Sequence, residues 1–260
     1  MRRERKATPS TRCAQPLAAV VLAALLALPC AAAAGGKGHT LLRKLDAKAT
    51  WARDQTFNYE MRIHDPGKAV QRMRFKVKIR GRKRFIKFTY PGDVKGMKVL
   101  ILSRSRMYTY LPAYRKIRRI ASHMRSQSLL GADYSYDDMS TVTYADVFKG
   151  RLVKQTAKVY VVDARLRPGK SAAYARIVFY LRKKDTMPVK LMYYNATGTK
   201  LKTETRRDYA CKQKACTARV MKMVDHTRNN HFTELIRKAW QINTGFSDRV
   251  FSKRQLQRAN

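Results

Sequence analysis

The stretch from Arg72 to Arg80 alternates strictly between basic and apolar residues. It reads Arg-Met-Arg-Phe-Lys-Val-Lys-Ile-Arg, so every second side chain carries a positive charge. Successive side chains of a β-strand point to opposite faces of a sheet, whereas a helix would mix the two kinds around its axis. This stretch therefore predicts a strand with one basic face and one apolar face.

The same period of two recurs along much of the chain. Turn-forming residues such as Pro66-Gly67, Pro91-Gly92 and Pro168-Gly169 separate the alternating runs. Strands joined by short turns at near-regular spacing indicate a mainly β protein, in which an antiparallel sheet curls into a barrel or half-barrel. The further strands are expected at residues 57–63, 86–90 and 175–181.

Helical patterns are few. Leu41, Leu42 and Leu45 would share one side of a helix from His39 to Ala52, and a short helical segment is expected from His123 to Leu130. The last residues, 246–260, fit either a closing strand or a short helix.

The N-terminus has the pattern of a cleavable signal peptide. Five basic residues precede an apolar run from Leu17 to Leu28, and small residues follow it up to Gly36. The run is shorter than the ~20 residues that a membrane-spanning helix needs, which argues against a retained anchor. Pro29 occupies the position before Cys30 where a lipoprotein site requires a small residue, so we expect a soluble product. The predicted organisation is a signal peptide over residues 1–34 and one domain over residues 35–260.

The chain is strongly basic. Cleavage after Ala34 would remove five basic residues and one acidic residue, so the formal net charge would fall from +40 to +36. Such a charge attracts anionic surfaces, whether phospholipid, lipopolysaccharide or nucleic acid. Because the protein is expected to be exported, we expect an anionic membrane surface and no nucleic acid as its partner.

Two cysteines, Cys211 and Cys216, remain in the predicted mature chain. In an exported protein, such a close pair most simply forms a disulfide that closes a hairpin. Together with His226 and His231 the two cysteines also resemble a zinc site. The central gap is shorter than usual and the compartment is oxidising, so the disulfide is the favoured reading and no metal is expected.

No set of residues with a catalytic pattern stands out. The five histidines are scattered, and neither Gly-x-Ser-x-Gly nor His-Glu-x-x-His occurs. Asp133, Ser135, Asp137 and Asp138 suggest a calcium loop but lack its glycine and terminal glutamate, so turn and helix-capping roles are favoured. We therefore expect no enzyme activity and no cofactor.

The apolar faces of the predicted strands are rich in aromatic residues. Taken strand by strand, such faces are ordinary core, but bulky, adaptable walls also suit a cavity for an apolar ligand. The candidate cavity residues are Phe57, Tyr59, Met61, Phe75, Val77, Ile86, Phe88, Tyr108, Tyr110, Ile177, Phe179, Leu191 and Tyr193.

Two segments carry the most specific similarity to a known family: Tyr110–Ile120 (Tyr-Leu-Pro-Ala-Tyr-Arg-Lys-Ile-Arg-Arg-Ile) and Ser128–Asp138 (Ser-Leu-Leu-Gly-Ala-Asp-Tyr-Ser-Tyr-Asp-Asp). They resemble the LolA-like family of periplasmic, outer-membrane lipoprotein-sorting proteins. Weaker similarities are Tyr90-Pro91, Lys95-Gly96, Met187–Lys190, Gly198–Lys202 and Thr233–Leu235. The resemblance spans essentially the whole predicted mature chain.

The resemblance implies a strongly curved antiparallel sheet, an unclosed β-barrel, with a few covering helices over an apolar cavity. It implies a periplasmic carrier of lipid or lipoprotein acyl chains toward the outer membrane, with an inner-membrane exporter and an outer-membrane acceptor as partners. No residue matches the lid-latching arginine of that family. Headgroup or anionic contacts are expected from Arg115, Lys116, Arg118 and Arg119 at the cavity mouth. The alternative is an envelope protein with a packed core that binds anionic lipid or lipopolysaccharide through its cationic surface.

Overall fold

The computed structural model describes residues 32–258, except residues 142 and 230. The predicted signal peptide, residues 1–34, lies outside this range apart from its last three residues, and so does Cys30. Among the described residues, no helix has the length and hydrophobicity needed to span a membrane.

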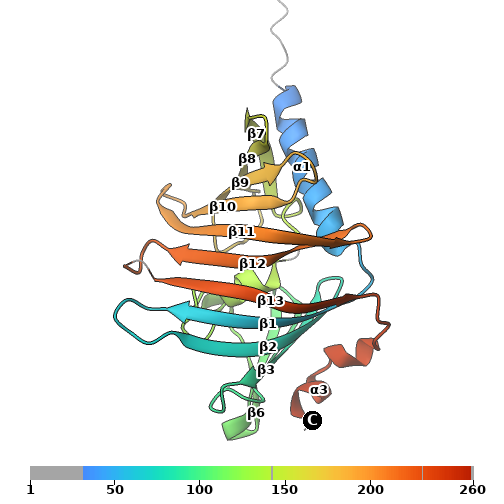
Figure 1. Cartoon of the computed structure of the whole chain (residues 1–260), viewed down its shortest axis with the longest axis vertical. Helices are drawn as coiled ribbons and strands as arrows, with labels where there is room; N and C mark the ends of the chain where they lie inside the picture. Colours follow the sequence, from blue (N-terminus) through green and yellow to red (C-terminus); the bar gives the residue numbers. More distant parts are fainter. Residues whose placement is uncertain (1–31, 142, 230, 259–260) are drawn as a thin grey trace, which may run out of the picture. The chain divides into compact units, whose positions relative to one another are not determined.

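The first half of the chain begins with a helix and continues as a meander of strands (Figure 1). The expected helix is present and begins earlier than predicted, and the strands around residues 57–63, 72–80 and 86–90 are confirmed. The bounds are α1 Ala32–Thr50, β1 Gln55–His64, β2 Gln71–Arg80, β3 Lys83–Tyr90, β4 Lys98–Ser103, β5 Arg106–Leu111 and β6 Lys116–Arg119.

A long connection, residues 120–147, leads to the second half of the chain. It contains a 3₁₀ turn at Ser122–Met124 and one short helix, α2, Tyr136–Ser140. The helix expected from His123 to Leu130 is therefore reduced to that 3₁₀ turn. Seven strands follow: β7 Phe148–Gln155, β8 Val159–Leu166, β9 Arg176–Arg182, β10 Pro188–Tyr194, β11 Lys200–Lys212, β12 Ala215–Asp225 and β13 Phe232–Ile242.

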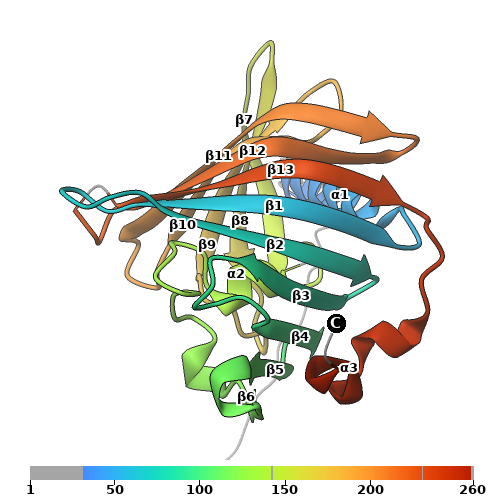
Figure 2. The same cartoon turned by 60° about the horizontal axis from the view of Figure 1, so that its bottom comes forward.

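All strands belong to one antiparallel sheet with thirteen strands in the order β6-β5-β4-β3-β2-β1-β13-β12-β11-β10-β9-β8-β7. The edge strands β6 and β7 do not pair with each other, so the barrel is unclosed, as predicted. The sheet curves strongly (Figure 2). Of the two alternatives left open for residues 246–260, a closing strand or a short helix, the structure has the helix, α3, Lys253–Gln257, next to β4 and β5.

Helix α1 packs on the inside of the curved sheet. It contacts the neighbouring strands β7 and β8 and also β12, which lies four strands from β8 in the sheet, and the curvature of the sheet brings these strands to one helix. Leu41, Leu42 and Leu45 are buried in the main apolar cluster, as the helical pattern predicted. At Gly38 the helix backbone lies directly against β7.

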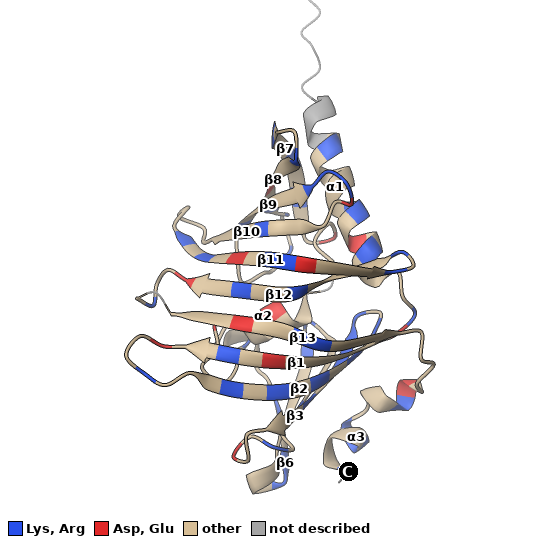
Figure 3. Cartoon of the chain, viewed as in Figure 1, with Lys and Arg blue, Asp and Glu red and all other residues tan. Residues whose placement is uncertain are grey.

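Strand β2 has the predicted apolar face and basic face. Met73, Phe75 and Val77 are buried on the concave face, while Arg72, Arg74 and Lys76 are exposed on the convex face. Figure 3 shows this basic band along β2 and further Lys and Arg residues over the rest of the sheet and α1.

The close approach of α1 to β7 predicts a sharp difference between two glycines of the helix. A Cβ on Gly38 would lie 2.4 Å from the backbone nitrogen of Leu152, whereas a Cβ on Gly36 would meet nothing within 4 Å. We expect Gly38→Ala to lower the free energy of unfolding by about 1–3 kcal/mol because α1 has to shift. Gly36→Ala should be neutral or stabilise by up to about 1 kcal/mol through helix propensity. Urea unfolding measures both, and equal stabilities would contradict this packing.

Candidate functional site

A cavity of about 330 Å³ lies between the concave face of the sheet, α1 and the connection of residues 120–147, which we call the lid segment. Its apolar wall comes from β1, β2, β9, β12 and β13, together with α1 and the turn between β9 and β10. The residues of this wall include Leu45, Ala49, Phe57, Val77, Ile79, Ile177, Met187, Met221, Met223 and Leu235.

Eleven of the thirteen candidate cavity residues lie on the concave side. Five of them, Phe57, Tyr59, Val77, Ile177 and Tyr193, line the cavity itself. The other six are buried in the main apolar cluster behind this lining: Met61, Phe75, Ile86, Phe88, Phe179 and Leu191.

Tyr108 and Tyr110 do not belong to the cavity. They lie on the convex face of β5, in a second cluster with Phe85, Leu100 and residues of the C-terminal segment such as Leu256. The expectation assumed that only one face of each strand is covered, but the C-terminal segment covers the other face here. The buried ammonium of Lys98 holds this segment by donating to the carbonyl of Leu256 at 3.0 Å.

The predicted headgroup residues Arg115, Lys116, Arg118 and Arg119 are exposed on or beside the edge strand β6. None of them lines the cavity, so the structure separates these residues from the apolar site. Beside them, Tyr114 is 65% exposed, with the guanidinium of Arg118 5.9 Å from its ring centre.

The wall of the cavity also carries a buried ion pair that the sequence pattern did not reveal. Arg206 donates from Nε and Nη2 to the two carboxylate oxygens of Glu204, at 2.8 and 2.9 Å, and the hydroxyl of Tyr193 donates to the same carboxylate at 2.6 Å. Strand β11 has charged residues at its inward positions 202, 204 and 206. Such a pattern, taken by itself, predicts a face exposed to solvent. The only sign of the ion pair in the sequence is that Glu204 and Arg206 carry opposite charges two residues apart, on the same face of the strand.

A second arginine, Arg84 of β3, connects the sheet to the lid segment. Its Nη2 donates to the carbonyl of Thr141 at 2.7 Å, and its Nη1 donates to the carbonyl of Met139. Burial lowers the pKa of Arg84 to about 10, so its side chain remains charged at neutral pH. Arg84 occupies an inward position next to Ile86 and Phe88, where the pattern predicts an apolar residue.

The lid segment is also fastened to the sheet by the carboxylate of Asp133. His231 Nδ1 lies 2.7 Å from this carboxylate, and the hydroxyl of Thr233 donates to it at 2.7 Å. From β11, the ammonium of Lys202 donates to the backbone carbonyl of Asp133 at 2.5 Å. The resembling segment Ser128–Asp138 therefore contains one of the points at which the lid segment is attached to the sheet.

The capping role expected for the acidic run is confirmed at the start of α2. The hydroxyl of Ser135 accepts from the backbone N–H of Asp138, and the Asp138 carboxylate accepts from the backbone N–H of Ser135 at 2.8 Å. Tyr174 also donates to this carboxylate, at 3.2 Å.

Helix α1 holds the far end of the lid segment through Asp46. The backbone N–H groups of Tyr144 and Ala145 donate to its carboxylate at 2.7–2.9 Å. Burial raises the pKa of Asp46 to about 6, although these hydrogen bonds act in the opposite direction.

The tyrosines around the cavity stay protonated. Burial raises the pKa of Tyr59 to about 12 and raises the pKa values of Tyr134, Tyr144 and Tyr193 as well. They therefore present neutral hydroxyl groups to the interior.

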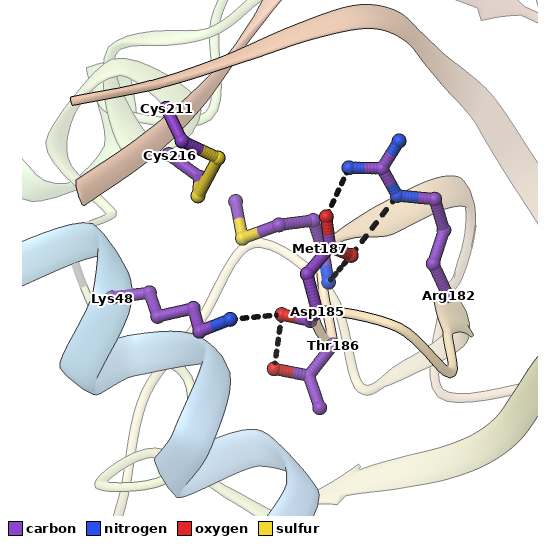
Figure 4. The surroundings of a disulfide bond; sticks show 7 residues. All are labelled: Lys48, Arg182, Asp185, Thr186, Met187, Cys211 and Cys216. Carbon is purple, nitrogen blue, oxygen red and sulfur yellow. Dashed lines mark hydrogen bonds and ion pairs between the residues drawn. A yellow bond between two sulfur atoms is a disulfide. The ribbon is translucent and has the colours of Figure 1, made fainter. Parts of the chain in front are cut away.

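The predicted disulfide between Cys211 and Cys216 is confirmed. The two cysteines are directly paired residues of β11 and β12. They lie near Met187, which comes directly before β10 (Figure 4). Beside them, the ammonium of Lys48, in the last turn of α1, donates to the carbonyl of Asp185 at 2.7 Å. Among the described residues, no group of three or more side chains is placed to hold a metal ion. The two histidines considered for zinc have other neighbours, Asp133 for His231 and Thr203 for His226.

The fold of the described residues, one unclosed antiparallel sheet, is similar to that of several solved structures. A protein domain from Vibrio parahaemolyticus assigned to outer-membrane lipoprotein sorting is 26% identical, with a TM-score of 0.76 over 86% of this chain and 100% of that one. A DUF1329 family protein from Desulfovibrio piger is 22% identical, with a TM-score of 0.78 over 86% of this chain and 99% of that one. A LolA superfamily protein from Nitrosomonas europaea is 17% identical, with a TM-score of 0.72 over 84% of this chain and 98% of that one.

These similarities show that the chain has a LolA-like fold. More narrowly, residues 80–258 match the profile of a family described as "Uncharacterized protein", and because the match covers more than half of the chain, the chain is a member of that family. No curated protein matches it.

The raised pKa of Asp46 predicts how stability depends on pH. The pKa is higher in the folded state than its ordinary value of 3.8, so protonation favours folding, and this contribution is lost as the pH rises through about 6. Between pH 4 and pH 7.5, wild type should lose about 2 kcal/mol relative to Asp46→Asn, which does not titrate. Urea unfolding at the two pH values tests this, with the exposed Asp93→Asn as a control. Parallel pH profiles for wild type and Asp46→Asn would contradict it.

Proposed function

We propose that the protein is a periplasmic carrier that binds lipid or lipoprotein acyl chains noncovalently and delivers them toward the outer membrane. The observation that carries the proposal is a cavity whose cover, the lid segment, is fastened by hydrogen bonds that Arg84 donates and that the carboxylates of Asp46 and Asp133 accept. Such contacts can break and reform without disturbing the sheet. The similar structures support the proposal because one of them is assigned to outer-membrane lipoprotein sorting.

The energetic need for such a carrier is large. Each methylene of an acyl chain costs about 0.8 kcal/mol in water, so a sixteen-carbon chain requires on the order of 12 kcal/mol of shelter. The cavity of about 330 Å³ is near the lower limit of ligand pockets, which measure roughly 300–1,000 Å³. We infer that the lid segment moves outward when a long chain enters.

A catalytic role is not part of the proposal. The acidic groups around the cavity are engaged in fastening the fold: Glu204 with Arg206, Asp138 with Ser135, and Asp46 with the backbone of the lid segment. The cavity supports a carrier over the alternative considered from the sequence, an envelope protein with a filled core.

The basic edge, which we define as Tyr114, Arg115, Lys116, Arg118 and Arg119, supplies the contact with an anionic membrane surface. The four cations are exposed, and the exposed Tyr114 ring suits the membrane interface. In this proposal the protein docks through the basic edge at an inner-membrane exporter and at an outer-membrane acceptor.

Filling the cavity tests the carrier function directly. Val77 lines the cavity and is buried, so Val77→Phe should occupy the space that the acyl chain needs. We expect affinity for a fluorescent long-chain fatty acid to fall at least tenfold, while the exposed control Val153→Phe leaves it unchanged. Thermal unfolding verifies that Val77→Phe is folded. Undiminished binding by the folded variant, or no binding by wild type, would refute a carrier that uses this cavity.

The basic edge makes a separate prediction. Each basic residue near an anionic surface contributes about 1 kcal/mol, so replacing Arg115, Lys116, Arg118 and Arg119 together by Gln should weaken binding to vesicles containing phosphatidylglycerol at least tenfold. The control replaces Lys154, Lys158, Lys184 and Lys214, exposed residues of β7 and of the turns β7–β8, β9–β10 and β11–β12. Vesicle co-sedimentation at low and high salt measures both variants. If the two quadruple variants bind equally, the charge of the whole protein and not this edge is responsible.

A further inference from the structure

Arg84 is a cation of the cavity wall without an acidic partner. Among the described residues, no carboxylate lies within ion-pair distance of its guanidinium, which donates only to the carbonyls of Met139 and Thr141. Its Nε atom is buried and has no hydrogen-bond partner in the described part of the chain. A buried charge is costly unless a counter-charge is nearby, so this arrangement is incomplete by itself.

Tyr134 presents a second unused donor to the same cavity. Its side chain belongs to the lid segment, lines the cavity and is only 5% exposed. The hydroxyl has no partner among residues 32–258 as far as they are described. Because burial keeps this hydroxyl protonated, it can donate to an acceptor inside the cavity.

The acids of the cavity wall do not neutralise Arg84, because each is committed elsewhere. Glu204 is bound by Arg206, and Asp137 is bound by Arg104 at 2.6 Å and keeps one unpartnered oxygen. Asp138 is held by Ser135 and Tyr174, and Asp46 by backbone N–H groups. Besides one oxygen of Asp137, the unmatched groups of the cavity wall named here are therefore the two donors Arg84 and Tyr134, and Arg84 carries a positive charge without a counter-charge.

We propose that the cavity selects single-chain lipids with an anionic oxygen group, a carboxylate or a phosphate, which pairs with Arg84 and accepts a hydrogen bond from Tyr134. The inference rests on the proposed carrier function and names the chemical class of its cargo. Charge-assisted hydrogen bonds of this kind are stronger than neutral ones. The acyl chain then lies against Phe57, Val77 and Ile177 in the same cavity. Head and tail are thus both sheltered, and the cargo would provide the counter-charge that Arg84 lacks.

The test compares ligands that share one sixteen-carbon chain. Palmitate, hexadecyl phosphate, methyl palmitate and hexadecanol each displace an uncharged fluorescent acyl probe from the full-length mature protein at pH 8. We expect palmitate or hexadecyl phosphate to bind at least about tenfold more tightly than methyl palmitate. The preference should persist at 0.5 M salt, because screening weakens exposed contacts more than buried ones.

Two variants assign the preference to the proposed groups. In Arg84→Gln, the ratio of acid to ester affinity should fall to near one, even if the loosened lid changes both affinities. In Tyr134→Phe, anion affinity should fall severalfold, while thermal stability is retained or raised, because the lost hydroxyl had no partner. The control Arg72→Gln removes an exposed charge from the convex face and should leave the ratio unchanged.

The ligand comparison distinguishes failure of the anion proposal from failure of the carrier function. If all four ligands bind with equal affinity, the anion proposal is overturned and the carrier function stands. If none binds, both fail. If the ratio survives in Arg84→Gln, the preference arises elsewhere and the proposed pairing is wrong. Comparing palmitate with hexadecyl phosphate then shows which of the two anionic groups the cavity prefers.

Discussion

A single curved sheet has no second sheet against which to bury its apolar face, and this constraint shapes the rest of the molecule. The concave side is covered by α1 and the lid segment. Apolar packing supplies most of the contact of α1, whereas the lid segment combines buried apolar residues with charged and polar anchors at Arg84, Asp46 and Asp133. Because the strand ladder does not pass through these anchors, the cover can move while the sheet remains intact.

The polar groups inside the cavity fix how the cavity wall and the lid segment are arranged. Apolar surfaces tolerate many similar arrangements, but the fork between Arg206 and Glu204 and the contacts of Asp133 require particular geometries. Such groups are expensive to bury, and the structure keeps them because each has a specific partner. Arg84 and Tyr134 depart from this rule within the described residues, which is why they direct attention to the cargo.

The architecture was readable from the sequence because a period of two is a local property of each strand. Phe75 and Val77 could be placed on the concave face from their neighbours alone. Tyr108 and Tyr110 could not, because their burial depends on a C-terminal segment about 150 residues further along the chain, and no local pattern records that contact. Arg84 and Glu204 were missed for a related reason. A charged residue is predicted on the inner face of a strand only when its partner is known. The partners here, the carbonyls of the lid segment for Arg84 and the guanidinium of Arg206 for Glu204, are visible only in the folded structure.

The two unpaired edges of the sheet have a consequence for how copies of this protein meet. An exposed strand edge is a template on which another chain can add a strand, and proteins often protect such edges with charge. Strand β6 carries Lys116, Arg118 and Arg119, and β7 carries Lys149, Arg151 and Lys154. Both edges are therefore positive, so any edge-to-edge approach between two molecules brings like charges together. The excess of basic residues thus favours dispersal of the protein at high concentration and disfavours its aggregation into extended sheets.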